Sequence, residues 1–171
     1  PASINAAMIG GIAANNASGM CCGTSENSYK TIDSIRVILH DGTVLDTSCE
    51  DSKTSFERTH ASLLQDLDNL AKKVRGNETL HARIRDKFKM KNTTGYSLNA
   101  LVDYTDPFDI LTHIMIGSEG TLGFISELIY KTVIEHKFKA SSLMMFPDIE
   151  KACRAVSILK SEPVAAVELM D

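Results

Sequence analysis

The sequence predicts an α+β protein in which a mainly antiparallel sheet of about five strands is flanked by helices. Two β-rich runs surround Asp41-Gly42, a dipeptide that is typical of hairpin turns. Residues 55–74 carry apolar side chains at spacings of three and four, which is the helical period. Residues 124–133 alternate apolar and polar side chains, as a half-buried strand does.

Length and charge restrict the function. The 171 residues predict one domain, or one domain and the beginning of a second. Lys and Arg number 18 against 22 Asp and Glu, and this net charge of −4 argues against nucleic acid or an anionic membrane as the main partner. No apolar stretch is long enough to span a membrane, and no basic segment precedes an apolar one at the N-terminus. We therefore expect a cytoplasmic protein, with peripheral association of a longer parent with the inner membrane left open.

The cysteines show no metal-binding spacing. Cys21, Cys22, Cys49 and Cys153 form neither a CxxC pair nor a Cys/His zinc pattern, so we expect reduced thiols and no metal site. The first residue is Pro1, which predicts a fragment of a longer protein.

The first half of the chain predicts a hairpin and two helices. Residues 34–39 and 43–47 are the hairpin strands, joined by a primed turn at Asp41-Gly42. The helix over residues 55–74 is expected to stop at Gly76-Asn77, and residues 79–89 predict a second, basic helix.

The second half predicts strands around one more helix. The apolar run 110–116 and the alternating run 124–133 are interpreted as two strands. Residues 141–146 and 165–170 predict further strands, with a helix between them that Asp148 caps. This order is half of a split β-α-β unit, and a domain boundary is expected near residues 135–140.

Seven of the ten glycines lie in two short windows. The first window is residues 9–23, with its core at Ile9 to Gly19, and the second is Gly117 to Gly123. Glycine lets backbone approach a ligand closely, although tight turns and close packing explain such windows as well. The second window lacks the lysine of a Walker A loop and the spacing of a nicotinamide dinucleotide fingerprint, which argues against both classes.

The order of several motifs is more specific than either window alone. These motifs are Gly10 to Gly19, Asp41 to Leu45, Lys91 to Tyr96 and Gly117 to Glu127. Together they resemble the second FAD-binding subdomain of the FAD-linked oxidases of the vanillyl-alcohol oxidase type. The branch resembled is the D-2-hydroxy-acid dehydrogenases, which act on D-lactate or D-2-hydroxyglutarate.

Other stretches resemble parts of particular members of this branch. Residues 20–24, 51–90 and 103–109 are similar to the large bacterial members that also carry an iron–sulfur region, and residues 167–171 are similar to the start of a ferredoxin-like substrate cap. The resemblance thus implies an FAD-binding subdomain over residues 1–136 and the beginning of the cap over 137–171.

The resemblance also implies a cofactor and its site. FAD would accept a hydride at flavin N5 from the 2-hydroxy acid, and the catalytic base, the first FAD subdomain, most of the cap and the electron acceptor would lie outside this chain. The implied cofactor-binding residues are Gly10, Gly11, Ala14, Asn15, Asn16, Ser18, Gly19, Gly117, Ser118, Glu119, Gly120, Gly123 and Ile125. Replacement of Gly117 or Gly120 is then expected to remove flavin selectively, because a Cβ would block the approach of the cofactor.

Other polar residues have simpler interpretations. Lys91, Asn92 and Tyr96 are candidates for the edge of the flavin pocket, although a turn explains them nearly as well. The alternation of Lys87, Lys89 and Lys91 with apolar residues predicts a solvated face. The histidines lack a carboxylate or histidine partner at a telling spacing and are interpreted as structural or surface residues: His40, His60, His81, His113 and His136.

Two other functions stay open at this stage. A stand-alone nucleotide-binding or phosphate-binding module would use the same glycines without redox activity. An interaction or scaffold domain would use them for folding alone, so that glycine replacement would lower stability without selective loss of flavin.

Overall fold

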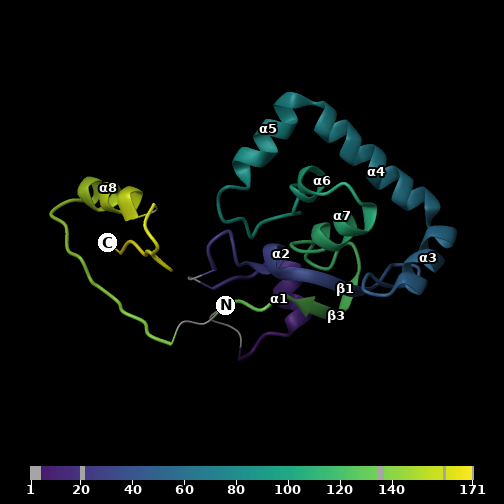
Figure 1. The fold of residues 1–171 in the computed structure, drawn as a ribbon, viewed down its shortest axis with the longest axis horizontal. Helices are drawn as coiled ribbons and strands as arrows, with labels where there is room; N and C mark the ends of the chain where they lie inside the picture. Colours follow the sequence, from purple (N-terminus) through teal and green to yellow (C-terminus); the bar gives the residue numbers. More distant parts are fainter. Residues whose placement is uncertain (1–4, 20–21, 135–136, 160, 171) are drawn as a thin grey trace.

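The computed structural model describes residues 5–19, 22–134, 137–159 and 161–170 and confirms the predicted α+β class (Figure 1). Cys21 and His136 lie outside these residues. No helix in the described ranges is long and apolar enough to cross a bilayer. The elements in chain order are α1 (Ile9–Asn15), α2 (Ser28–Thr31), β1 (Ile32–Ile38), β2 (Val44–Asp46), α3 (Glu50–Thr59), α4 (Ala61–Gly76), α5 (Glu78–Lys87), α6 (Ala100–Asp103), α7 (Pro107–Ile114), β3 (Phe124–Tyr130) and α8 (Ile149–Leu159).

The sheet is smaller than the sequence predicts. Within the described residues it has three antiparallel strands in the order β2-β1-β3, instead of about five. Val37 of β1 stands opposite Leu45 of β2 and Ile125 of β3, and all three side chains are buried. The central strand β1 therefore lies in the core. Helices α3, α4, α6 and α7 pack further apolar side chains into this core.

The predicted hairpin is present, but its turn is not of the primed type. The N–H of Leu39 donates to the carbonyl of Thr43 at 2.9 Å, and the N–H of Gly42 donates to the carbonyl of Leu39 at 3.0 Å. Gly42 has a φ of 84°, whereas Asp41 is not among the residues with positive φ. The three-residue loop thus combines a type I turn with one left-handed glycine, because the extra residue His40 removes the need for two left-handed positions.

The helix predicted over 55–74 is two helices, α3 and α4, which break at His60. The imidazole of His60 stacks on Phe56 with ring centroids 4.3 Å apart. Its Nε2 lies 3.0 Å from Asp41 Oδ2 on the hairpin loop. His60 thus has a carboxylate partner that local spacing does not reveal, because the two residues are 19 positions apart in the sequence.

The predicted end of α4 and the predicted basic helix are both confirmed. Asn77 follows the last residue of α4, and its side-chain oxygen accepts from the N–H of Leu80 at 3.0 Å to cap α5. One residue thus ends one helix and starts the next.

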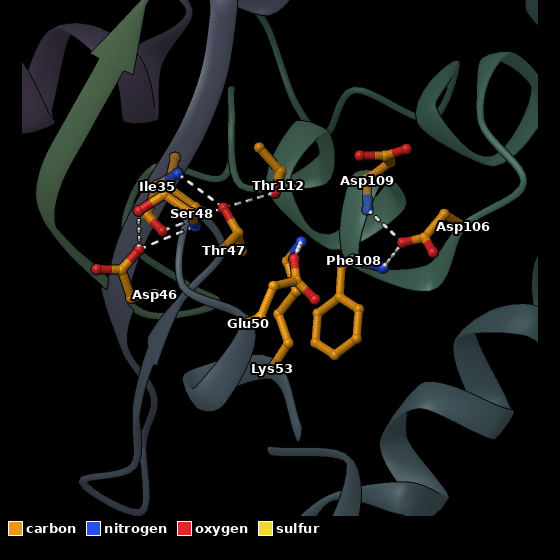
Figure 2. Close-up of polar contacts among 10 residues, drawn as sticks. All are labelled: Ile35, Asp46, Thr47, Ser48, Glu50, Lys53, Asp106, Phe108, Asp109 and Thr112. Carbon is orange, nitrogen blue, oxygen red and sulfur yellow. Dashed lines mark hydrogen bonds and ion pairs between the residues drawn. The ribbon is translucent and has the colours of Figure 1, made fainter. Parts of the chain in front are cut away.

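The apolar run 110–116 is not a strand but belongs largely to helix α7. Asp106 caps this helix by accepting from the N–H of Phe108 at 2.7 Å and of Asp109 at 3.2 Å (Figure 2). Pro107 occupies the first turn, where its missing N–H costs nothing. Because a short apolar run has no resolvable period, these start signals decide between strand and helix. The second glycine window therefore joins a helix to a strand.

Helix α7 is connected to the sheet through Thr47. The hydroxyl of Thr47 accepts from the N–H of Ile35 at 2.9 Å and lies 3.4 Å from the hydroxyl of Thr112 on α7 (Figure 2). Both threonines are buried, so this contact fixes α7 against the central strand from inside the core.

The C-terminal part contains one helix without the predicted strands. Helix α8 follows Asp148, whose carboxylate accepts from the N–H of Lys151 at 2.8 Å as predicted. Residues 141–146 and 165–170 form no strands, because no partner strand pairs with them among the described residues. Helix α8 lies apart from the sheet (Figure 1).

The cap of α7 gives a stability prediction. Asp106→Ala removes the acceptor of two backbone N–H groups and should lower the free energy of unfolding by about 1 kcal/mol. Asp106→Asn keeps a capping oxygen and should retain most of that stability. Urea denaturation of the three proteins measures both differences, and equal losses in the two variants would contradict this role of the side-chain oxygen.

The hairpin loop gives a pH prediction. Hydrogen bonds from the N–H of Thr43, from His60 and from the hydroxyl of Thr43 lower the pKa of Asp41 to about 2, from 3.8. A lowered pKa means that the ionised carboxylate stabilises the fold above about pH 4, and that this contribution is lost as the pH falls toward 2. The difference in melting temperature between wild type and Asp41→Asn should therefore shrink over this interval. A constant difference would show that ionisation of Asp41 is irrelevant to stability.

Candidate functional site

Three segments that are distant in the sequence meet at the C-terminal end of α1. They are residues 15–19, the loop 91–97 and the turn 117–121, and we call them the glycine cluster. Five hydrogen bonds join these segments to one another or to the end of α1. They run from Asn16 Nδ2 to Asn92 O at 3.1 Å, from Gly117 N to Ala13 O at 3.2 Å, from Glu119 N to Ala14 O at 2.9 Å, from Asn15 Nδ2 to Glu119 Oε1 at 2.6 Å, and between Tyr96 OH and Thr121 Oγ1 at 2.7 Å. The two predicted windows and the predicted polar loop therefore form one structural unit.

The first window is a helix followed by a left-handed residue, not an open loop. Asn16 has φ 53° and ψ 34°, and its N–H donates to the carbonyl of Ala13 at 2.9 Å. The next N–H, that of Ala17, reaches back to Ile12 at 2.9 Å. Asparagine adopts this conformation at a lower cost than most residues, so Asn16 terminates α1 and turns the chain toward residues 17–19.

The second window is a turn with unusual backbone angles. Gly117, Glu119 and Gly120 have φ values of 88°, 53° and 75°. A left-handed conformation at a residue other than glycine costs about 1–3 kcal/mol and persists only where surrounding contacts hold it. At Glu119 those contacts come from α1, through the carbonyl of Ala14 and the side chain of Asn15.

Several of the predicted glycines pack against protein backbone. A Cβ on Gly10 would lie 2.8 Å from the carbonyl oxygen of Ile125, and one on Gly123 would lie 2.9 Å from that of Ile38. A Cβ on Gly117 would lie 2.9 Å from the carbonyl oxygen of Gly95. The expectation that a Cβ on Gly117 blocks a cofactor is therefore corrected, since the protein itself occupies that space.

Other predicted residues leave room for a ligand. A Cβ on Gly11 or Gly120 would have no atom within 4 Å, so their backbone faces are open. Ile125 differs from these two, because its side chain is buried in the core.

The hydroxyl groups of Ser18 and Ser118 are enclosed and have no hydrogen-bond partner among the described residues. Unsatisfied buried polar atoms are uncommon in folded proteins, and a bound group is one explanation for them. Two unsatisfied hydroxyls, open glycine backbone and the ammonium of Lys91 are groups that suit a ligand with several oxygen acceptors, such as the diphosphate or ribityl part of FAD. The chemistry of the cluster thus fits FAD.

A buried aromatic group lies behind the cluster and was not predicted from the sequence. The N–H of Tyr29 donates to Asn16 Oδ1 at 3.3 Å, and its hydroxyl donates to Asp103 Oδ2 at 2.9 Å. The ring of His113 stacks on that of Tyr104 with centroids 3.9 Å apart, and burial lowers the pKa of His113. The contact between Tyr29 and Asp103 spans 74 residues of sequence, which explains why spacing gives no sign of it.

A small cavity of about 20 Å³ is lined in part by Asn16, Asn92 and Ser97 of the cluster, whereas a larger one lies elsewhere. A groove of about 450 Å³ lies between α3, α4 and the start of α7, and three carboxylates line it, those of Glu57, Asp68 and Asp106. This volume suits a ligand pocket. However, an acidic lining repels phosphate, so we place the candidate site at the glycine cluster. No group of three or more metal-ligating side chains occurs within the part of the chain that the structure describes.

The N-terminal part of the chain is similar to a known family. Residues 1–48 match the family described as the FAD binding domain. This match indicates FAD binding and supports the expected resemblance to the FAD-linked oxidases. The matched part ends two residues after β2, so it includes α1, Asn16 and Ser18 of the glycine cluster.

A curated relative matches nearly the whole chain. The D-2-hydroxyglutarate dehydrogenase of Haemophilus influenzae is 24% identical over 174 residues. The aligned part covers 98% of this chain but 17% of the relative, so the chain spans a minor share of that protein. No solved structure matches the chain.

Adjacent glycines of α1 provide a matched test of close packing between this helix and β3. Gly10→Ala should lower the free energy of unfolding by about 1–3 kcal/mol, because its Cβ would overlap the carbonyl of Ile125. Gly11→Ala meets open space and should be neutral, or stabilising by up to about 1 kcal/mol through helix propensity. Chemical denaturation compares the two variants, and equal effects would contradict the close contact between α1 and β3.

Proposed function

We propose that the chain is the flavin-binding part of an FAD-dependent dehydrogenase that oxidises a D-2-hydroxy acid, of the D-2-hydroxyglutarate or D-lactate class, to the 2-oxo acid. The observation that carries this proposal is the similarity to D-2-hydroxyglutarate dehydrogenase along 98% of the chain. The match of residues 1–48 to the FAD binding domain supports the flavin part of the proposal independently.

The glycine cluster supplies binding groups and not a proton-transfer group. The buried hydroxyls of Ser18 and Ser118 lack a hydrogen-bond partner among the described residues, and the open backbone of Gly120 allows a flat or extended group to lie against the chain. Asn15 holds the carboxylate of Glu119 at 2.6 Å, which fixes the strained turn in place. When bound, FAD supplies the acceptor for the hydride of the substrate.

The proposal places the catalytic base outside this chain. Among the described histidines, His113 is buried between aromatic rings and His60 pairs with Asp41, so neither is free to accept a substrate proton. We also propose that residues 1–136 belong to the FAD-binding domain and that residues 137–171 begin a substrate cap. The absence of buried residues in α8 supports this division.

Anaerobic spectroscopy of the complete protein tests the function. The purified protein should show flavin absorption bands, and one of D-2-hydroxyglutarate and D-lactate, added in separate cuvettes, should bleach them by reducing the flavin. The L enantiomers are the matched controls and should leave the bands unchanged.

The outcomes separate the parts of the proposal. Bands that neither D acid bleaches would overturn the substrate class and keep the flavin assignment. A colourless protein that FAD does not reconstitute would overturn the flavin assignment itself and favour a nucleotide-binding module without redox activity.

A further inference from the structure

The ammonium of Lys91 lies against backbone carbonyls of the first glycine window. Its Nζ is 3.3 Å from the carbonyl oxygen of Ser18 and 3.4 Å from that of Gly19. The side chain is exposed, and no carboxylate of the described residues forms an ion pair with it. Lys89 lies two residues earlier and differs, because its Nζ pairs with Asp86 Oδ1 at 3.2 Å. Lys91 is thus not simply part of a solvated face.

The two carbonyl oxygens that contact Lys91 carry no net charge and therefore do not neutralise its positive charge. An ammonium group has three N–H donors, and the two long contacts to carbonyls use at most two of them. The unsatisfied hydroxyl of Ser18 belongs to the same residue as one of these carbonyls. A cationic donor and a neutral donor therefore lie together at this edge of the glycine cluster.

The other charged group of the cluster does not neutralise Lys91. Glu119 lies across the cluster, where its carboxylate accepts from Asn15 at 2.6 Å. An anionic group with several oxygens, such as a phosphate, satisfies both the charge of Lys91 and the hydroxyl of Ser18, whereas the uncharged flavin ring satisfies the hydroxyl alone.

We propose that Lys91 binds the diphosphate of FAD and so orients the cofactor along residues 15–19. This inference rests on the proposed function, because it takes FAD as the ligand. It assigns to the loop 91–97 a direct role in cofactor binding, in addition to its contact with α1 through Asn92.

Ligands that share only part of FAD test the role of Lys91. The complete protein is stripped of flavin, and dissociation constants are measured for FAD, for ADP and for riboflavin, which lacks phosphate. Lys91→Met should lower the affinity for FAD and for ADP by about tenfold or more at low salt, which is the scale of a charge-assisted hydrogen bond. The affinity for riboflavin should be unchanged. Lys91→Arg should restore most of the affinity for FAD, and Lys89→Met is the matched control that should bind all three ligands as wild type does.

Salt and stability distinguish binding from a structural contact. The affinity of wild type for FAD should fall with ionic strength, and this dependence should be weaker in Lys91→Met, because screening acts on the charge that was removed. If Lys91→Met lowers the affinity for FAD and for riboflavin equally and also lowers the melting temperature, then Lys91 only connects the loop to residues 18 and 19. This result would overturn the inference. Unchanged FAD affinity would also overturn it. A wild-type protein that binds neither FAD nor riboflavin would instead overturn the proposed function.

Discussion

The left-handed conformation of Asn16 is the constraint on which the glycine cluster depends. This residue ends α1, and its buried side chain accepts from the N–H of Tyr29 while it donates to the carbonyl of Asn92. One amide thus connects three parts of the chain that are up to 76 residues apart. Because the amide group is buried, the loss of either partner would leave a polar atom unsatisfied, which costs about 1–3 kcal/mol.

The contacts of α1 with the turn 117–121 follow from that constraint. Once the chain leaves α1 at Asn16, the carbonyls of Ala13 and Ala14 accept from the backbone of the turn at 3.2 and 2.9 Å. The glycines then have two distinct roles. Gly10 and Gly117 allow backbone segments to approach one another, whereas Gly11 and Gly120 leave the space beside their backbone open. Close packing and open backbone thus occur in one small region.

Local signals in the sequence predicted the elements that local contacts stabilise. The hairpin around Asp41-Gly42, the stop at Gly76-Asn77 and the cap at Asp148 all involve atoms within a few residues of one another. The interpretation of 110–116 as a strand was wrong, because the apolar run outweighed the start signals at Asp106 and Pro107. The predicted C-terminal strands also failed, since a strand needs a partner that local sequence does not reveal.

The candidate site was predicted as a set of residues, but its arrangement was not. The order of the two windows and of the loop between them indicates the family, and the structure brings all three together. Which glycine faces protein and which faces open space depends on segments about 100 residues apart, such as Gly10 and Ile125. The same holds for Lys91, whose charge meets carbonyls 72 and 73 residues away. Such distances are beyond the reach of periodicity and spacing.

The formation of helix α8 is coupled to the burial of its apolar side chains. It has 11 residues, none of them buried, and isolated helices shorter than about 12–15 residues are marginal in water. Its apolar side chains, among them Ile149 and Ile158, gain little free energy until another apolar surface covers them. Formation of α8 and burial of its apolar face are therefore one coupled equilibrium, so the helicity of this segment reports directly on whether its partner surface is in place.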